Sequence, residues 1–236
     1  MATSMKLLVV PPKGNHTATV IFMHGLGDSG YGWKPVADQL SRDSSFQHIK
    51  WVLPHAPTVR CTANGGMPMP GWFDILSFDF KGPEDETGIL YSRDAFNNLI
   101  EQEIKEGIPA DRIVIGGFSQ GAAMTLVTGL TTPHKLAGLT ILSGWFAIRG
   151  KVKELLGQHA TTVPIFWGHG ADDPLIPLEM GKFSKAELEK IGGKEAKEPG
   201  EPGIFFKEYP GLAHSADTQE IDDWASWLKK VIPSSS

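Results

Sequence analysis

Seven short apolar runs, separated by helix-like or polar segments, constrain the fold more than any other feature of the sequence. Residues 86–106 and 218–231 instead repeat apolar residues at three- and four-residue steps, which predicts helices. Several of the runs are apolar at nearly every position, as expected of strands buried on both faces. The alternation predicts an α/β fold with a mostly parallel central sheet and helices on both faces. The predicted strands are residues 6–10, 18–23, 49–53, 112–116, 137–143, 163–168 and 203–209.

The length of 236 residues suits one large domain, and no linker or repeat divides the chain, so we expect a single domain over residues 1–236. Residues 54–82 depart from the alternation and are rich in Pro, Gly and Met. Because a loop this long within a compact domain is usually functional, we interpret it as a substrate-site or lid loop. Residues 192–203 indicate a surface excursion, and residues 232–236 indicate a frayed end.

Composition excludes several classes of protein. The net charge is −5 and no Lys/Arg-rich run occurs, which argues against binding to nucleic acid. A single cysteine rules out a disulfide framework and a zinc site built from several cysteines. The apolar run near the amino terminus is too short for a signal peptide. Residues 113–134 lack Asp, Glu, Lys and Arg and are long enough to cross a bilayer, but they contain several glycines and polar residues, which argues against a membrane span. We therefore expect a cytoplasmic protein without a membrane span.

The segment Gly-Phe-Ser-Gln-Gly at 117–121 matches the pattern G-x-S-x-G. The pattern alone is weak, but here an apolar strand leads into it and a helix-forming run follows. A sharp strand-to-helix turn exposes a serine as a nucleophile, and small glycines tolerate the crowding. Ser119 would then lie at a helix N-terminus, where backbone N–H groups favour a developing oxyanion.

A serine nucleophile needs a general base and an acid that orients the base. In hydrolases with this turn, the acid and then the histidine follow the serine along the chain. His214 follows the last predicted strand and is the best-placed base. The acid is expected after the preceding strand, where Asp172 and Asp173 are adjacent. We favour Asp173 because Pro174 rigidifies its turn and because neighbouring side chains usually point apart.

The second oxyanion donor is expected in the loop after an early strand. The sequence His-Gly-Leu-Gly at 24–27 follows the strand predicted at 18–23, and its glycines allow the backbone to approach a substrate carbonyl. We assign the backbone N–H of Leu26 as a donor beside that of Gln120. For His24 itself a structural hydrogen-bonding role is the better interpretation.

Motifs spread over most of the chain resemble those of the acyl-protein thioesterase and small carboxylesterase branch of the α/β-hydrolases. They are HGLGDSGYGW at 24–33, LPHAP at 53–57, GWFDI at 71–75, EDETGI at 84–89, GIPADRIVIGGFSQGAA at 107–123, LAGLTILSGW at 136–145, HGADDPLIPL at 169–178 and YPGLAHS at 209–215. The resemblance implies an α/β-hydrolase fold with Ser119 as nucleophile, Asp173 as acid and His214 as base. It also implies cleavage of fatty acyl thioesters and oxyesters, on proteins or lysophospholipids, without a metal or cofactor.

The loop at 54–82 decides which acyl chains fit, and we expect Trp72, Leu76, Phe78 and Trp145 to contact the acyl group. The chain begins Met-Ala, without the amino-terminal cysteine that some animal relatives acylate, so we expect at most transient membrane contact. We also expect a monomer or weak homodimer. The alternative enzyme is a short-chain carboxylesterase or deacetylase with the same three residues and a restricted acyl pocket. A ligand receptor with this fold and poor turnover is a third possibility.

Overall fold

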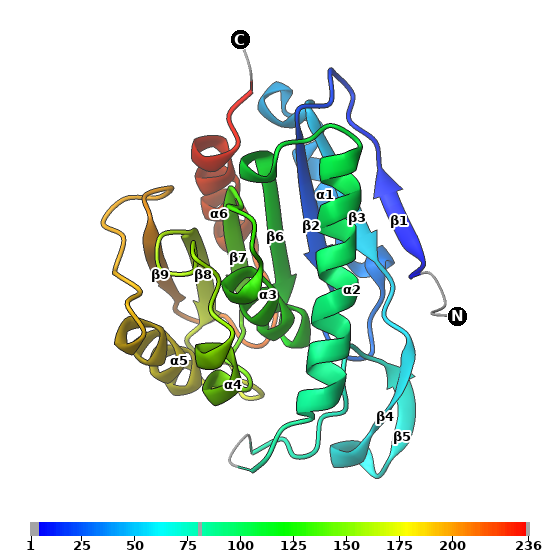
Figure 1. Cartoon of the computed structure of the whole chain (residues 1–236), viewed down its shortest axis with the longest axis vertical. Helices are drawn as coiled ribbons and strands as arrows, with labels where there is room; N and C mark the ends of the chain where they lie inside the picture. The colour runs from blue at the N-terminus through cyan, green and yellow to red at the C-terminus, as the bar shows by residue number, and fades with distance from the viewer. Residues whose placement is uncertain (1–4, 80–81, 235–236) are drawn as a thin grey trace.

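A seven-stranded sheet forms the centre of the computed structural model, which describes residues 5–79 and 82–234 (Figure 1). The strand order is β1-β3-β2-β6-β7-β8-β9; β1 is antiparallel to β3 and every other pair is parallel. The predicted mostly parallel α/β fold is thus confirmed. The strands are β1 (Leu7–Val10), β2 (Ala18–Met23), β3 (Ile49–Pro54), β6 (Ile113–Phe118), β7 (Gly138–Leu142), β8 (Pro164–Gly170) and β9 (Gly203–Tyr209).

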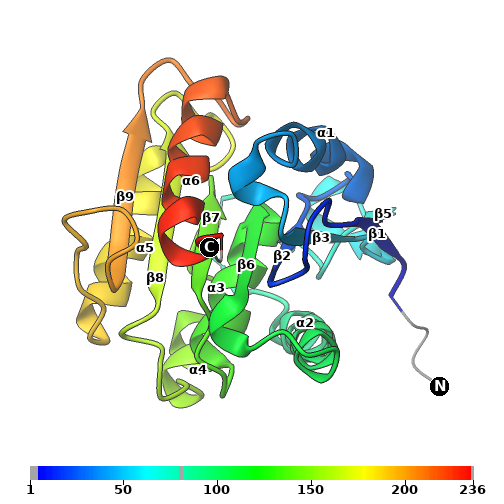
Figure 2. The same cartoon turned by 90° about the horizontal axis from the view of Figure 1, so that it is seen from above.

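Helices cover both faces of the sheet, as Figure 2 shows from above. The helices α1 and α6 pack on one face, and α2, α3, α4 and α5 pack on the other. Their bounds are α1 (Gly30–Leu40), α2 (Glu86–Lys105), α3 (Gln120–Thr131), α4 (Arg149–Glu154), α5 (Leu178–Lys190) and α6 (Thr218–Val231), and short 3-10 turns occupy Ser44–Phe46, Thr62–Asn64 and Ala110–Arg112.

Two apolar cores result, because successive side chains of a strand point to opposite faces of the sheet. In β2, Ile21 and Met23 enter the core under α2 and α3, whereas Val20 and Phe22 enter the core under α1 and α6. All six residues of β2 are buried. This double burial explains why the central strands are continuous apolar runs.

The segment 54–82 contains more regular structure than we expected. Strands β4 (Thr58–Cys61) and β5 (Met67–Pro70) form an antiparallel hairpin, which lies at the lower end of the molecule in Figure 1. The segment is therefore not one continuous loop, and residues 80–81 lie outside the described part of the chain. The sequence did not predict β5, because this strand reads Met-Pro-Met-Pro and proline is tolerated only in edge strands.

The carboxyl-terminal segment is anchored further than predicted. Ile232 is buried, and its carbonyl oxygen accepts a hydrogen bond from Nε2 of His48 at 3.1 Å. The Arg112 guanidinium donates to the carbonyl oxygen of Pro233 at 2.8 Å. The predicted frayed end at 232–236 is therefore wrong for these two residues, and residues 235–236 lie outside the described part.

Among the described residues, no helix is both long and apolar enough to cross a bilayer. The apolar stretch at 113–134 is divided between β6 and the 12-residue helix α3. The expected cytoplasmic location and weak self-association stay predictions.

Candidate active site

The turn between β6 and α3 places Ser119 at the carboxyl edge of the sheet. Ser119 has φ 55° and ψ −118°, a conformation that costs a non-glycine residue about 1–3 kcal/mol and persists only where the surroundings impose it. Close backbone packing explains the flanking glycines. A Cβ atom on Gly117 would overlap the backbone of Gly121, and one on Gly121 would overlap the carbonyl oxygen of Met23. The turn therefore aims the serine outward while its neighbours pack tightly.

Ser119, His214 and Asp173 lie in one hydrogen-bonded row. Oγ of Ser119 is 2.9 Å from Nε2 of His214, and Nδ1 of His214 is 2.6 Å from Oδ2 of Asp173. Because a carboxylate only accepts, Nδ1 carries the proton and Nε2 is left to accept from the serine hydroxyl. The structure thus brings the three side chains predicted from sequence into the arrangement of a nucleophile, a base and an orienting acid.

The environment of Asp173 keeps it ionised. Its carboxylate is fully buried, and burial raises the pKa of Asp173. The hydrogen bond from His214 and the backbone N–H groups of Ile176 and Leu175 act in the opposite direction, and the net pKa of Asp173 lies below its usual value. Asp172, the alternative acid, is exposed, and its backbone N–H donates to the carbonyl oxygen of Leu212.

Leu26 and Gln120, the residues expected to supply the oxyanion donors, border the same cavity as Ser119 from different elements. Gln120 is the first residue of α3, so its N–H has no partner within the helix. Leu26 follows β2, and within the described part of the chain its N–H donates to no protein group. The next residue, Gly27, has φ 82° and donates to the carbonyl oxygen of Pro70 at 2.8 Å. This bond fixes the loop that carries Leu26.

The side chain of Gln120 anchors the loop after β5. Its Oε1 accepts from the backbone N–H of Trp72 at 3.0 Å, and its Nε2 donates to the carbonyl oxygen of Phe73 at 2.8 Å. Both amide ends are thus used, and the start of α3 is tied to the segment that borders the site. Sequence reasoning identified the backbone of Gln120 but not this second role.

The remaining histidines near the site have structural partners. Nδ1 of His24 donates to the carbonyl oxygen of Gly25 at 2.7 Å, and Nε2 accepts from the N–H of Ala56 at 3.0 Å. His169 is fully buried and its Nε2 donates to the carbonyl oxygen of Ile176 at 2.8 Å. Burial lowers the pKa of both His24 and His169. These partners favour a structural role for both.

A cavity of about 480 Å³ opens beside Ser119, within the range usual for small-molecule sites. Leu26, Gln120, His214, Phe78 and Trp145 border it, as expected if they contact the substrate. Most of the other bordering residues are apolar and come from the loops after β2, β5 and β8, together with the last residue of β6. They are Gly25, Asp28, Ile75, Phe118, Pro174, Leu175 and Ile176.

Two expected acyl contacts need correction. Trp72 is buried beneath the site: its Nε1 donates to the carbonyl oxygen of His24 at 2.8 Å, and its ring packs against Phe96. Leu76 borders a small neighbouring crevice, whereas the preceding residue, Ile75, borders the cavity. Ile75 is buried whereas Leu76 is exposed, and only the fold shows which of the two borders the cavity beside Ser119. The motif GWFDI contains both Trp72 and Ile75 but does not distinguish them.

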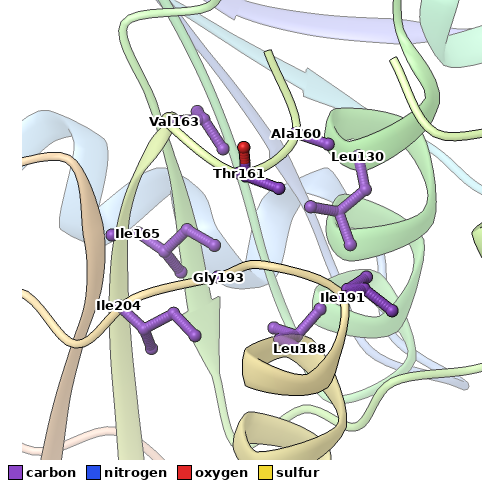
Figure 3. Close-up of a pocket in the computed structure, with 10 residues that line it drawn as sticks. Leu130, Ala160, Thr161, Val163, Ile165, Leu188, Ile191, Gly193 and Ile204 are labelled. Atoms are coloured by element: carbon purple, nitrogen blue, oxygen red, sulfur yellow. The ribbon is translucent and has the colours of Figure 1, made fainter. Parts of the chain in front are cut away.

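Another hollow lies away from these residues, among the carboxyl-terminal end of α3, α5 and the starts of β8 and β9 (Figure 3). Its volume is about 10 Å³, which leaves room for at most about one water molecule. Its walls are mostly apolar, and we interpret it as a packing gap. Within residues 5–79 and 82–234, no cluster of three His, Cys, Asp or Glu side chains could hold a metal ion.

A model of the phospholipase/carboxylesterase family matches residues 5–232. The chain belongs to this family. Acyl-protein thioesterase 1 of Cryptococcus neoformans is 46% identical and aligns over 98% of this chain and 100% of its own length. Acyl-protein thioesterase 1 of Neurospora crassa is 43% identical, over 96% of this chain and 91% of its own length. The resemblance inferred from the sequence motifs is thus confirmed.

Solved structures agree with this membership of the phospholipase/carboxylesterase family. SOBER1 of Arabidopsis thaliana superimposes with a TM-score of 0.84 at 33% identity, over 92% of this chain and 99% of that one. Acyl-protein thioesterase 2 of Zea mays superimposes with a TM-score of 0.81 at 29% identity, over 96% of this chain and 99% of that one. The α/β-hydrolase fold expected from the resemblance is confirmed.

Proposed function

We propose that this protein is a serine hydrolase that removes fatty acyl groups from thioesters and esters, on acylated proteins or lipid esters, through an acyl-enzyme. The observation that carries the proposal is the hydrogen-bonded row of Ser119, His214 and Asp173, of which Ser119 and His214 border a largely apolar cavity. The names of the two fungal relatives support acyl-protein thioesters as the substrate class.

The proposed reaction has two similar halves. His214 Nε2 takes the hydroxyl proton as Ser119 Oγ attacks the acyl carbonyl carbon, and Asp173 stabilises the imidazolium that forms. The N–H groups of Leu26 and Gln120 bind the oxyanion of the tetrahedral intermediate. The thiol or alcohol then leaves with the proton from His214. Water, activated by the same histidine, attacks the acyl-enzyme and releases the carboxylic acid.

The size and lining of the cavity favour fatty acyl groups over acetyl groups. A site for an acetyl group needs room for one methyl, whereas this cavity measures about 480 Å³ and is bordered by Ile75, Phe78, Trp145, Leu175 and Ile176. Burying each methylene of an acyl chain contributes about 0.8 kcal/mol. The short-chain carboxylesterase or deacetylase therefore stays the second candidate, and a profile of acyl chain lengths separates the two.

The direct test is Ser119→Ala, with Ser226→Ala as the matched control. Ser226 is an exposed serine on α6 whose hydroxyl donates to the carbonyl oxygen of Asp222. We expect Ser119→Ala to abolish hydrolysis of p-nitrophenyl and thioester substrates and labelling by a fluorophosphonate probe, and Ser226→Ala to retain both. Circular dichroism checks that both variants fold. Retained hydrolysis in folded Ser119→Ala would refute the proposal.

A further inference from the structure

Two loops that do not follow one another in sequence form part of the wall of the cavity. One loop, between β5 and α2, supplies Ile75 and Phe78; the other, between β7 and α4, supplies Trp145. Ile75 and Trp145 border both this cavity and the small crevice behind it. The position of Trp145 relative to the first loop therefore determines where the cavity ends.

The carboxylate of Glu84 joins the two loops. Glu84 belongs to the first loop, directly before the N-cap of α2, and is half-buried. Its Oε1 accepts from Nε1 of Trp145 at 2.9 Å, and its Oε2 accepts from the backbone N–H of Ile148 at 2.6 Å. Each oxygen thus holds a different point of the second loop, and hydrogen bonds to an ionised acceptor are stronger than neutral ones.

The second of these points is under strain. Ile148 has φ 38° and ψ 38°, a left-handed conformation that is unusual for a β-branched residue. Such a conformation persists only where neighbouring groups impose it, and the bond to Glu84 is one of the contacts that do so. Loss of the carboxylate would remove the bonds to the indole N–H and to the strained backbone at Ile148.

Behind Trp145 the structure offers further space. The crevice that Trp145 shares with Glu84 measures about 20 Å³ and is bordered by residues of the first loop. Beyond it, a hollow of about 490 Å³ is bordered by Glu84, Arg149, Lys151 and Lys153 and opens to solvent. Trp145 and Glu84 therefore lie between the apolar cavity and a hollow with basic side chains that opens to solvent. An acyl chain that passed Trp145 would enter the crevice first.

We infer that Glu84 is a positioning residue that sets the acyl-chain length accepted by this site, by fixing Trp145 as the end wall of the cavity. The inference rests on the proposed function, since it requires that the cavity hold the acyl chain. Glu84 does not contact the reacting atoms. It acts through the indole of Trp145 and the backbone at Ile148.

The test compares chain-length profiles of Glu84→Ala and wild type, using p-nitrophenyl esters and acyl thioesters from two to twenty carbons. We expect the optimum of kcat/KM to move to longer chains in the variant, through a lower KM. Each methylene newly buried in the crevice should contribute about fourfold. Trp145→Phe, which lacks the N–H, should shift the profile in the same direction, and the double variant should shift it no further than the larger single effect.

Glu86→Ala is the matched control, because Glu86 is an exposed carboxylate two residues away that borders the basic hollow but neither the cavity nor the crevice. Its profile should match that of wild type. An unchanged profile in folded Glu84→Ala, or a uniform loss at all chain lengths, would overturn the role of Glu84 while wild-type hydrolysis still supports the proposed function. A wild-type protein that hydrolyses none of the substrates would refute the proposed function itself.

Discussion

Replacing Asp173 by asparagine tests the site sharply, because the two carboxylate oxygens have different partners. Oδ1 accepts from the backbone N–H groups of Leu175 and Ile176, each at 2.8 Å, and Oδ2 accepts from Nδ1 of His214 at 2.6 Å. In Asp173→Asn the amide oxygen has to stay at the two backbone donors, since an NH2 group there would face two N–H groups. The NH2 group then points at His214, whose Nδ1 must become an acceptor.

The consequence is a histidine with its proton on the wrong nitrogen. With Nε2 protonated, His214 can no longer accept the proton of Ser119 Oγ, although all the side chains keep their places. The corresponding change in the serine protease triad lowers kcat about 10⁴-fold. We expect a loss of this size here, equivalent to about 5 kcal/mol of transition-state stabilisation at 1.36 kcal/mol for each factor of ten.

The assay is kcat/KM for p-nitrophenyl butyrate at neutral pH, with circular dichroism to establish that the variant folds. Asp172→Asn is the matched control, because Asp172 is the adjacent, exposed carboxylate and should retain wild-type activity. A loss of less than about tenfold in Asp173→Asn would refute the orienting role of Asp173. An equal loss in both variants would refute the choice between the two acids.

Three further predictions concern a buried carboxyl group, the turn at Ser119 and the wall of the cavity. Glu220 is fully buried, and burial raises its pKa to about 8 from 4.5. Between these pH values the folded state keeps a proton that the unfolded state releases, so the stability of the wild type falls as pH rises. Glu220→Gln cannot lose this proton, and its Tm should rise relative to that of the wild type from pH 5 to 8. A difference in Tm that stays constant over this range would contradict the prediction. Gly121→Ala should abolish activity or folding, because its Cβ would overlap backbone atoms, and a fully active, stable variant would be inconsistent with the turn at Ser119. Ile75→Ala should reduce kcat/KM for long acyl chains by about tenfold, whereas Leu76→Ala, at an exposed side chain, should change it little. A larger effect at Leu76 would contradict the placement of Ile75 in the cavity wall.

The fold could be predicted to the level of the sheet, because burial leaves a direct trace in the sequence. A strand covered on both faces is apolar at nearly every position; β2 (Ala18–Met23) departs from this only at Thr19, and β6 begins with the apolar run Ile113–Ile115. The β4–β5 hairpin leaves no such trace. Its strands are mostly exposed or half-buried, and prolines interrupt the second one. The hairpin also contacts a distant part of the chain through the bond from Gly27 to Pro70, which no local pattern encodes.

The candidate site also has a part that the sequence predicted and a part that it did not. Ser119, Asp173 and His214 were predictable because each follows a recognisable strand, and parallel strands present their carboxyl ends at one edge of the sheet. The acyl contacts were only partly predictable. Trp72 is an aromatic residue of the kind that often lines binding sites, yet its indole N–H donates to the backbone carbonyl oxygen of His24. Aromatic character alone does not show whether a side chain faces the cavity or the core.

The hydrogen-bonded row and the wall of the cavity are held in place by different parts of the fold, so acyl specificity can change without a change in the row. The hydrogen-bonded row is held by backbone geometry at strand ends, whereas the wall of the cavity is held by side chains that join separate loops, as Glu84 joins Trp145 to its own loop. Substitutions in the wall should therefore alter which acyl chain is accepted while the geometry at Ser119 is kept. Because Glu84 lies outside the cavity that borders Ser119, a single change there can move the wall without removing a group that touches the substrate. Chain-length preference is thus the property of this enzyme that we expect to be most open to change by substitution.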